Sequence, residues 1–382
     1  MYLQPWRRRT KRNPWPWVAS FIVAFAAAWY LYLQQRTILE AVRGPLPTPT
    51  PTEISAPEHV AVGDRHFASG QYDDALAEYV RATELDPTLA VAYARWGRIL
   101  ALRRQTAEAV RTARRAVELD AESAENQAIL AMTLDWNNEV ADAMVAGRKA
   151  TTLDPSYALG HAYLAEAYGD YGYTRDAFEA AEKAVELDPS HFWVRRNLGY
   201  IYELTGQYDQ AIYEYKAAVE INPAHAFVYL DIGRNYRVLQ EWDEAITYFE
   251  RATQADPQDP QGYDQVGWTY FAQGMYQPAQ TELEKATQVD PSYAPAFGHL
   301  GTVYYAQRNY EDAITHLQTA IELGARTEEY YYQLGLSYAY TGRCEEALPW
   351  FEQALQINPA SAIAQKGLAD CQADQSAQPG GS

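Results

Sequence analysis

The chain has few residues of the kinds that mark several classes of protein. Its 382 residues include only two cysteines, too few for a secreted scaffold held together by disulfides. Positive charge is also scarce, because 31 Lys and Arg stand against 50 Asp and Glu for a net charge of −19. Such a negative net charge argues against nucleic acid as a partner. With 48% hydrophobic residues, the chain still has enough apolar material to fold.

Common catalytic motifs are missing as well. The sequence has no HExxH, GxxxxGK[ST] or GxGxxG segment, the patterns that place zinc ligands or cradle phosphates. The seven histidines are scattered without the spacing of metal ligands. The segments described below leave no room for an added catalytic domain. We therefore predict that the protein is not an enzyme and needs no metal or cofactor, and no small-molecule substrate is evident.

The amino-terminal 55 residues differ from the rest in charge. Their net charge is +5, which leaves −24 for residues 56–382. An uncharged stretch at 17–33 follows the basic residues 1–16, with Trp and Tyr at both of its ends. We predict that 17–33 is a transmembrane signal anchor in a single-pass cell membrane protein, with 1–16 in the cytoplasm and the body outside it. A cleaved signal peptide and a buried helix of the body are the alternatives.

Residues 34–55 are predicted to be a juxtamembrane segment and a Pro/Thr-rich linker. The alternating Thr and Pro between Gly44 and Pro57 cannot form a helix, because proline lacks an N–H and biases the preceding residue toward extended geometry. An extended polyproline spacer would hold the body away from the membrane. A joint without any further role fits this composition equally well.

From residue 56 onward the sequence repeats with a period of 34 residues. Places twenty and twenty-seven of every unit are alanine, and place eight is glycine or alanine. Nine units follow one another without insertion or deletion: 56–89, 90–123, 124–157, 158–191, 192–225, 226–259, 260–293, 294–327 and 328–361. Such a period is typical of stacked supersecondary units, because one unit cannot bury its apolar face alone.

The unit at 192–225 shows why each repeat should form two helices. Leu198 and Tyr202 lie four residues apart, so they share one face of a first helix. Gly206 can end that helix, because glycine adopts a positive φ. Pro223 then stops a second helix. The small residues at fixed places let the two helices approach closely, and larger ones fill the grooves between them.

These units resemble the tetratricopeptide repeat (TPR). The small-residue places, the aromatic residue at place seventeen and the closing Asp-Pro or Asn-Pro match that family over residues 56–361. With the predicted anchor, the chain resembles membrane-anchored bacterial-type TPR proteins. The resemblance implies an all-α, right-handed superhelical solenoid of nine helix-turn-helix repeats. A capping helix at 362–374 and a disordered tail at 375–382 would follow.

The resemblance also implies a function. It suggests a membrane-tethered scaffold or adaptor that binds peptide segments of partner proteins in the concave groove of the superhelix. The alternative is an accessory subunit of an envelope export or polysaccharide-assembly machine, with a glycan or an enzyme in the groove. In both cases residues 17–33 would provide the contact with the membrane.

Places five, nine and twelve of each unit are spaced to face the groove. Cationic and aromatic side chains at or beside these places are typical anchors of binding surfaces. The predicted partner-binding residues are Arg196, Asn197, Tyr200, Arg234, Arg237, Trp268 and Phe271. The arginines favour a peptide whose acidic or carboxyl-terminal group lies beside an apolar side chain. The alternative is pairing within the array, Glu203 with Arg237 and Asp264 with Arg234.

The two cysteines, Cys344 and Cys371, allow two interpretations. They could join the cap to the array through a disulfide. They could also be two small, half-buried apolar residues, and the sequence favours this second interpretation.

Overall fold

The computed structural model describes residues 15–34 and 54–377. The chain divides into two compact units, 1–54 and 55–382, which are described separately here. Most of the predicted basic segment at 1–16, the linker at 35–53 and the last residues of the predicted tail, 378–382, lie outside the described residues. Helix α1 (Trp15–Leu33) is the described element of the first unit.

The prediction of a transmembrane anchor at 17–33 is wrong. Helix α1 has 19 residues and extends about 28 Å at 1.5 Å per residue. Among the described residues, no helix is both long enough and apolar enough to cross a membrane. The predicted single-pass localisation is wrong for the same reason.

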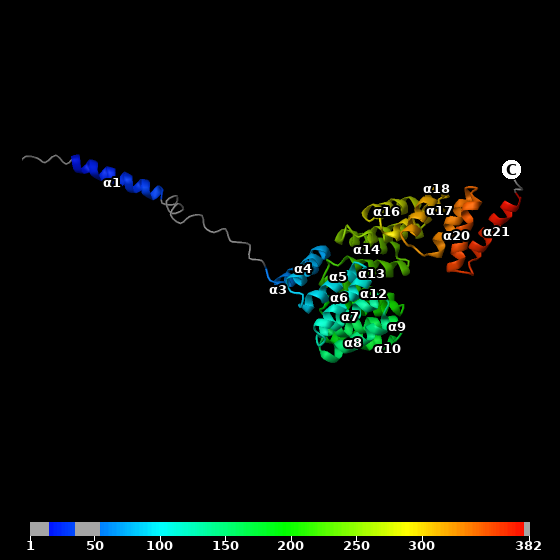
Figure 1. Cartoon of the computed structure of the whole chain (residues 1–382), viewed down its shortest axis with the longest axis horizontal. Coiled ribbons are helices and arrows are strands. Elements are labelled where there is room, and N and C mark those ends of the chain that lie inside the picture. Colours follow the sequence, from blue (N-terminus) through cyan, green and yellow to red (C-terminus); the bar gives the residue numbers. More distant parts are fainter. Residues whose placement is uncertain (1–14, 35–53, 378–382) are drawn as a thin grey trace, which may run out of the picture. The chain divides into compact units, whose positions relative to one another are not determined.

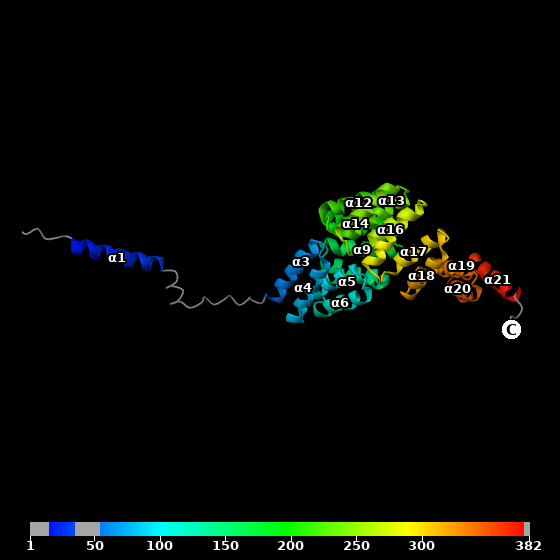
Figure 2. The ribbon, with the colours of Figure 1, turned by 90° about the horizontal axis from the view of Figure 1, so that it is seen from above.

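The second unit is a solenoid of helix pairs joined by short turns (Figures 1 and 2). The pairs are α3 (Ala56–Ala68) and α4 (Tyr72–Leu85), α5 (Ala90–Leu102) and α6 (Thr106–Leu119), α7 (Ala124–Trp136) and α8 (Val140–Leu153), α9 (Ala158–Tyr171) and α10 (Thr174–Leu187), α11 (Phe192–Leu204) and α12 (Tyr208–Ile221), α13 (Ala226–Val238) and α14 (Trp242–Ala255), α15 (Pro260–Ala272) and α16 (Tyr276–Val289), α17 (Ala294–Ala306) and α18 (Tyr310–Glu322), and α19 (Glu328–Tyr340) and α20 (Cys344–Ile357). A last helix, α21 (Ala362–Ala377), continues past the predicted end of the cap at 374. The predicted all-helical solenoid is confirmed.

Small residues set the distance between the two helices of a pair. A Cβ added to Gly199 of α11 would lie 2.8 Å from the ring of Tyr215 on α12. The glycine is therefore required by the close approach of that ring. The turns between helices require a residue with a positive φ. Asn138 has φ +65° at the place where most units have glycine. Asparagine tolerates this left-handed conformation better than most residues.

The first two helix pairs contact loops that are far away in the sequence. Tyr72 shares a hydrogen bond of 2.6 Å with Nδ1 of His225, a residue 153 positions later, and both side chains are buried. Asn222 donates to the carbonyl oxygen of Ala68 over 3.1 Å. Arg103, in the turn after α5, pairs with Asp256 after α14 at 3.7 Å. This part of the superhelix is therefore closed upon itself, with α3–α6 beside the ends of α12 and α14.

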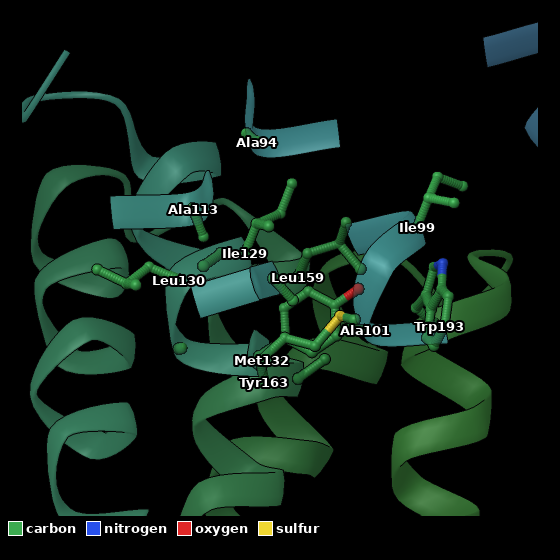
Figure 3. Close-up of a cluster of buried hydrophobic side chains, with 14 of the residues drawn as sticks. Ala94, Ile99, Ala101, Ala113, Ile129, Leu130, Met132, Leu159, Tyr163 and Trp193 are labelled. Atoms are coloured by element: carbon green, nitrogen blue, oxygen red, sulfur yellow. The ribbon is translucent and has the colours of Figure 1, made fainter. Parts of the chain in front are cut away.

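Large side chains fill the interior of the closed part (Figure 3). The Trp193 ring on α11 is buried and lies 6.1 Å from the ring of Tyr163 and 5.3 Å from that of Phe227. Ile129 and Met132 of α7 add to the same core and are almost fully buried. The sequence predicted an open concave groove along the first helices. In this part of the array, that inner face is largely a packed core.

We expect Gly70→Val to disrupt the closing contact. Gly70 has φ +75°, and a Cβ there would lie 2.4 Å from the carbonyl oxygen of Ala224. The variant should lose about 2 kcal/mol of unfolding free energy, measured by thermal or urea denaturation. Gly172→Val is the matched control, because it has φ +91° but nothing within 4 Å of its Cβ. Equal losses in both variants would mean that the contact with Ala224 contributes nothing.

The carboxyl-terminal helix is covalently attached to the array. Cys344, the first residue of α20, and Cys371 of α21 form a disulfide, with their Cα atoms 5.1 Å apart. The structure thus contains the bridge that the sequence did not favour. The bond holds α21 against the last helix pair.

We expect Cys371→Ser to loosen α21. The bridge spans a sequence separation of 27 residues, and the chain-entropy model gives such a loop about 3.5 kcal/mol of stabilisation. Urea denaturation of the oxidised wild type and the variant should show this difference. Wild type treated with a reductant should behave like the variant. Two free thiols in denatured protein that was never reduced would show that the bond is absent in solution.

Candidate functional site in the closed superhelix

Arg196 and Asn197, two of the predicted groove residues, are buried. Arg196 is 8% exposed, its Nη1 lies 2.5 Å from Oε1 of Glu166 on α9, and its Nε lies 3.6 Å from Oδ2 of Asp231 on α13. Asn197 is fully buried and donates to the carbonyl oxygen of Ala162 on α9. Arg196 therefore links the first helices of three successive pairs, and Asn197 links those of two, so both side chains already have partners within the array.

Three other predicted residues also find partners within the array. Arg237 donates to Oε1 of Gln265 over 2.8 Å. The Trp268 ring stacks on Phe271 and on His299, with centroid distances of 4.7 and 4.1 Å. These side chains pack along α13, α15 and α17.

The pairing predicted within the array occurs with different partners. Glu203 accepts hydrogen bonds from Tyr215 and Asn235 rather than pairing with Arg237. Asp264 lies 2.7 Å from His299, and Arg234 pairs with Asp231 instead. The general interpretation holds, but the predicted partners are wrong, because donors on the second helix (Tyr215) and on the same helix (Arg234) lie nearer than those that the spacing suggested.

A carboxylate cluster surrounds Arg196, and the sequence analysis did not identify it. Asp135 is 4% exposed, and burial with the nearby charges of Glu166 and Asp170 raises its pKa to about 9. The protonated carboxyl of Asp135 can donate a hydrogen bond to Asp170, which also accepts one from Tyr200. The sequence could have identified this cluster. Asp135 and Glu166 occupy places twelve and nine of their units, which are among the places that predicted the groove residues of units five to seven.

A cavity of about 310 Å³ opens beside this cluster. Its charged side chains are Arg104, Arg196, Arg234 and Asp231, and its apolar wall includes Phe227 and Leu230. The Arg234 side chain is 40% exposed and pairs with buried Asp231. Arg104 is exposed and donates to Gln261. The cavity therefore presents two accessible guanidinium groups next to an apolar surface.

The structure brings two of the seven predicted residues, Arg196 and Arg234, into this cavity. Arg104 belongs to the turn after α5, and no spacing within units five to seven could reveal it. It reaches the cavity only because the superhelix closes and places that turn beside the loop before α15. Within residues 15–34 and 54–377, no group of three or more His, Cys, Asp or Glu could hold a metal ion.

The closed stack of helix pairs defines the class of protein, a helical-repeat solenoid. A family model for the C-terminal domain of cilia and flagella-associated protein 70 matches residues 174–382, and a TPR repeat model matches residues 63–103. The chain belongs to the tetratricopeptide repeat family, as the sequence predicted. No match to the chain was found among curated proteins.

Solved structures with this fold cover most of the chain. The crystal structure of the APC/C hetero-tetramer Cut9–Hcn1 is 15% identical, with a TM-score of 0.56 over 83% of this chain and 76% of that chain. The human IFIT1 dimer with m7Gppp-AAAA is 17% identical, with a TM-score of 0.55 over 80% of this chain and 91% of that one. At these identities the likeness concerns the fold alone.

Proposed function

We propose that this TPR chain is a scaffold, without catalysis of its own, that binds a peptide segment of a partner protein. The TPR fold is typical of protein–protein interaction scaffolds and is typically non-enzymatic. We also infer that the array contains nine repeats over 56–361 in a right-handed superhelix, because each helix pair occupies one 34-residue unit. No observation on the described residues favours the alternative of an envelope export or polysaccharide-assembly subunit.

The proposal depends on the cavity between Arg104 and Arg234. A guanidinium carries several N–H donors in a planar fork that fits a carboxylate. Arg104 donates one hydrogen bond to Gln261 and is exposed, so further donors can reach a ligand. Phe227 and Leu230 provide an apolar wall for a neighbouring side chain. The best ligand is therefore a peptide with an acidic or carboxyl-terminal group next to an apolar residue.

The charge of the body makes such a site selective. Residues 56–382 carry −24, so an acidic protein surface is repelled as a whole. A short segment that reaches Arg104 meets a local cationic site instead. Repulsion of unsuitable partners combined with attraction at one contact is a common source of specificity.

Arg104→Glu tests this function. A fluorescein-labelled short peptide that ends in leucine and glutamate should bind the variant about tenfold more weakly or worse, by fluorescence anisotropy. The thermal midpoint should stay within a few degrees, because Arg104 is exposed. Arg111→Glu is the control, since Arg111 is exposed on α6, outside the cavity lining, and gives the same change in charge. Equal losses in the two variants, or unchanged binding to Arg104→Glu, would contradict the proposal.

A further inference from the structure

A second cavity, of about 700 Å³, lies at the carboxyl-terminal end of the array. Figures 1 and 2 show α19–α21 at the end of the solenoid that is remote from α3–α8. Its lining includes Tyr305, Leu336, Tyr340, Ile363, Lys366 and Asp370. These side chains come from α17, α19 and α21. This wall is open, unlike the packed interior of the closed part.

Two tyrosines, Tyr305 and Tyr340, form the aromatic side of this second cavity, and Tyr310 packs against both of them. The ring centroids of Tyr305 and Tyr310 are 6.0 Å apart, and those of Tyr310 and Tyr340 are 4.9 Å apart. Tyr340 is 58% exposed and lines the cavity together with Tyr305. In the described part of the chain, the cation–π contacts lie on other rings, such as that of Arg343 over Tyr338 at 4.5 Å. The faces of these tyrosines can therefore accept a cation from a ligand.

Carboxylates stand on the neighbouring wall. Asp370 and Asp374 are exposed, lie one turn apart on α21 and both line the cavity. Lys366 is the one cation among the described lining residues. It precedes Asp370 by one turn, so its charge offsets only part of the two negative charges. The cavity thus combines aromatic faces with a net negative charge, and this combination complements a positively charged ligand.

The disulfide fixes the wall that carries these carboxylates. Cys344 and Cys371 both line the cavity, and their bond attaches α21 to α20. Because α21 is held in place before a ligand arrives, little ordering is needed on binding. The apolar side chains of Leu336 and Ile363 lie in the same cavity and offer contact area beside the charges.

We propose that this cavity binds a basic polypeptide segment in which lysine or arginine is flanked by an apolar residue. The cation lies against Tyr340 and close to Asp370 and Asp374, and the apolar neighbour contacts Leu336 and Ile363. The inference rests on the proposed scaffold function. It adds a second site with the opposite charge preference, so that one chain can hold two different segments at once.

The test uses the full chain and two fluorescein-labelled short peptides. One has a single arginine between two leucines in a glycine–serine background, and the other has glutamine in place of that arginine, so that the cavity at Arg104 is not proposed to bind either peptide. The arginine peptide should bind about tenfold more tightly or better. Asp370→Lys should abolish most of that preference, Tyr340→Ala should weaken binding several-fold, and Lys366→Glu should tighten it. Because all three side chains are exposed, the thermal midpoints should stay within a few degrees.

Matched variants control for net charge and for the loss of an aromatic residue. Glu220→Lys changes the charge as Asp370→Lys does, and Tyr213→Ala removes another exposed tyrosine, from α12. Neither should alter binding of the arginine peptide. The inference is overturned if both peptides bind equally, if Glu220→Lys weakens binding as much as Asp370→Lys does, or if light scattering shows a dimer that Asp370→Lys dissociates.

The two proposals can fail separately. If the arginine peptide does not bind but the peptide that ends in leucine and glutamate binds through Arg104, the basic-peptide cavity is wrong and the scaffold function survives. If neither peptide binds, both proposals are wrong.

Discussion

Replacing Arg196 with methionine should lower the free energy of unfolding by about 3–5 kcal/mol. The guanidinium of Arg196 lies between Glu166 and Asp231, both of which are buried. Methionine fills part of the volume but leaves buried Glu166 without its cation and buried Asp231 with only Arg234 as its cation. The variant also loses the contacts of the guanidinium with the rings of Trp136 and Tyr200, at 5.7 and 5.1 Å. Breaking a buried ion network by removing one member is among the most destabilising single changes.

Urea denaturation of the variant and of a matched surface change measures this effect. Arg175→Met breaks an exposed pair with Glu179 on α10, in which the arginine side chain is 88% exposed, and should cost less than about 0.5 kcal/mol. Adding Glu166→Gln to Arg196→Met should recover part of the loss, because one of the two buried charges is then gone. A loss in Arg196→Met as small as that in Arg175→Met would show that Arg196 is not a structural link. It would then be available to a ligand, as the sequence first suggested.

The sequence predicted the helix pairs because the repeat fixes them locally. Alanine at two places and a small residue at a third determine where the helices of a pair touch, and the turn residues determine where each helix ends. Every pair from α3 to α20 accordingly falls within one unit of the period. The closing contact between Tyr72 and His225 could not be predicted in this way. It depends on small rotations from one repeat to the next that add up over the array.

The same limit explains the predicted binding residues. Spacing correctly placed Arg196 and Asn197 on first helices, but it could not show that the inner face is filled there by Trp193 and Phe227. The sequence did not favour the disulfide, because the distance between Cys344 and Cys371 depends on how α21 packs. The anchor prediction was based on charge and on aromatic residues at the ends of 17–33. Neither feature measures whether a helix is long enough and apolar enough to cross a membrane.

Asp135→Asn should stabilise the protein, by an amount that grows by about 1.4 kcal/mol per pH unit between about pH 5 and about pH 8. Burial and the charges of Glu166 and Asp170 raise the pKa of Asp135 to about 9 in the folded state, against about 3.9 in the unfolded chain. Between these values the folded protein keeps a proton that the unfolded chain has lost. The free energy of unfolding of the wild type therefore falls as the pH rises across that window.

Asparagine removes this proton uptake and keeps a donor. Its amide N–H can donate to Asp170, as the protonated carboxyl of Asp135 does, and it carries no charge that burial penalises. Thermal unfolding at several pH values should show the difference between variant and wild type growing from about pH 5 to about pH 8. Histidines that titrate in this range are the same in both proteins, so their effects cancel in the difference.

Asp209→Asn is the control, because Asp209 is exposed in the first turn of α12. Removing that charge should slightly destabilise the helix, and by the same amount at each pH. If the difference for Asp135→Asn were likewise constant with pH, Asp135 would be ionised in the folded protein. The cluster around Arg196 would then carry a further buried negative charge, and the loss predicted for Arg196→Met would be larger still.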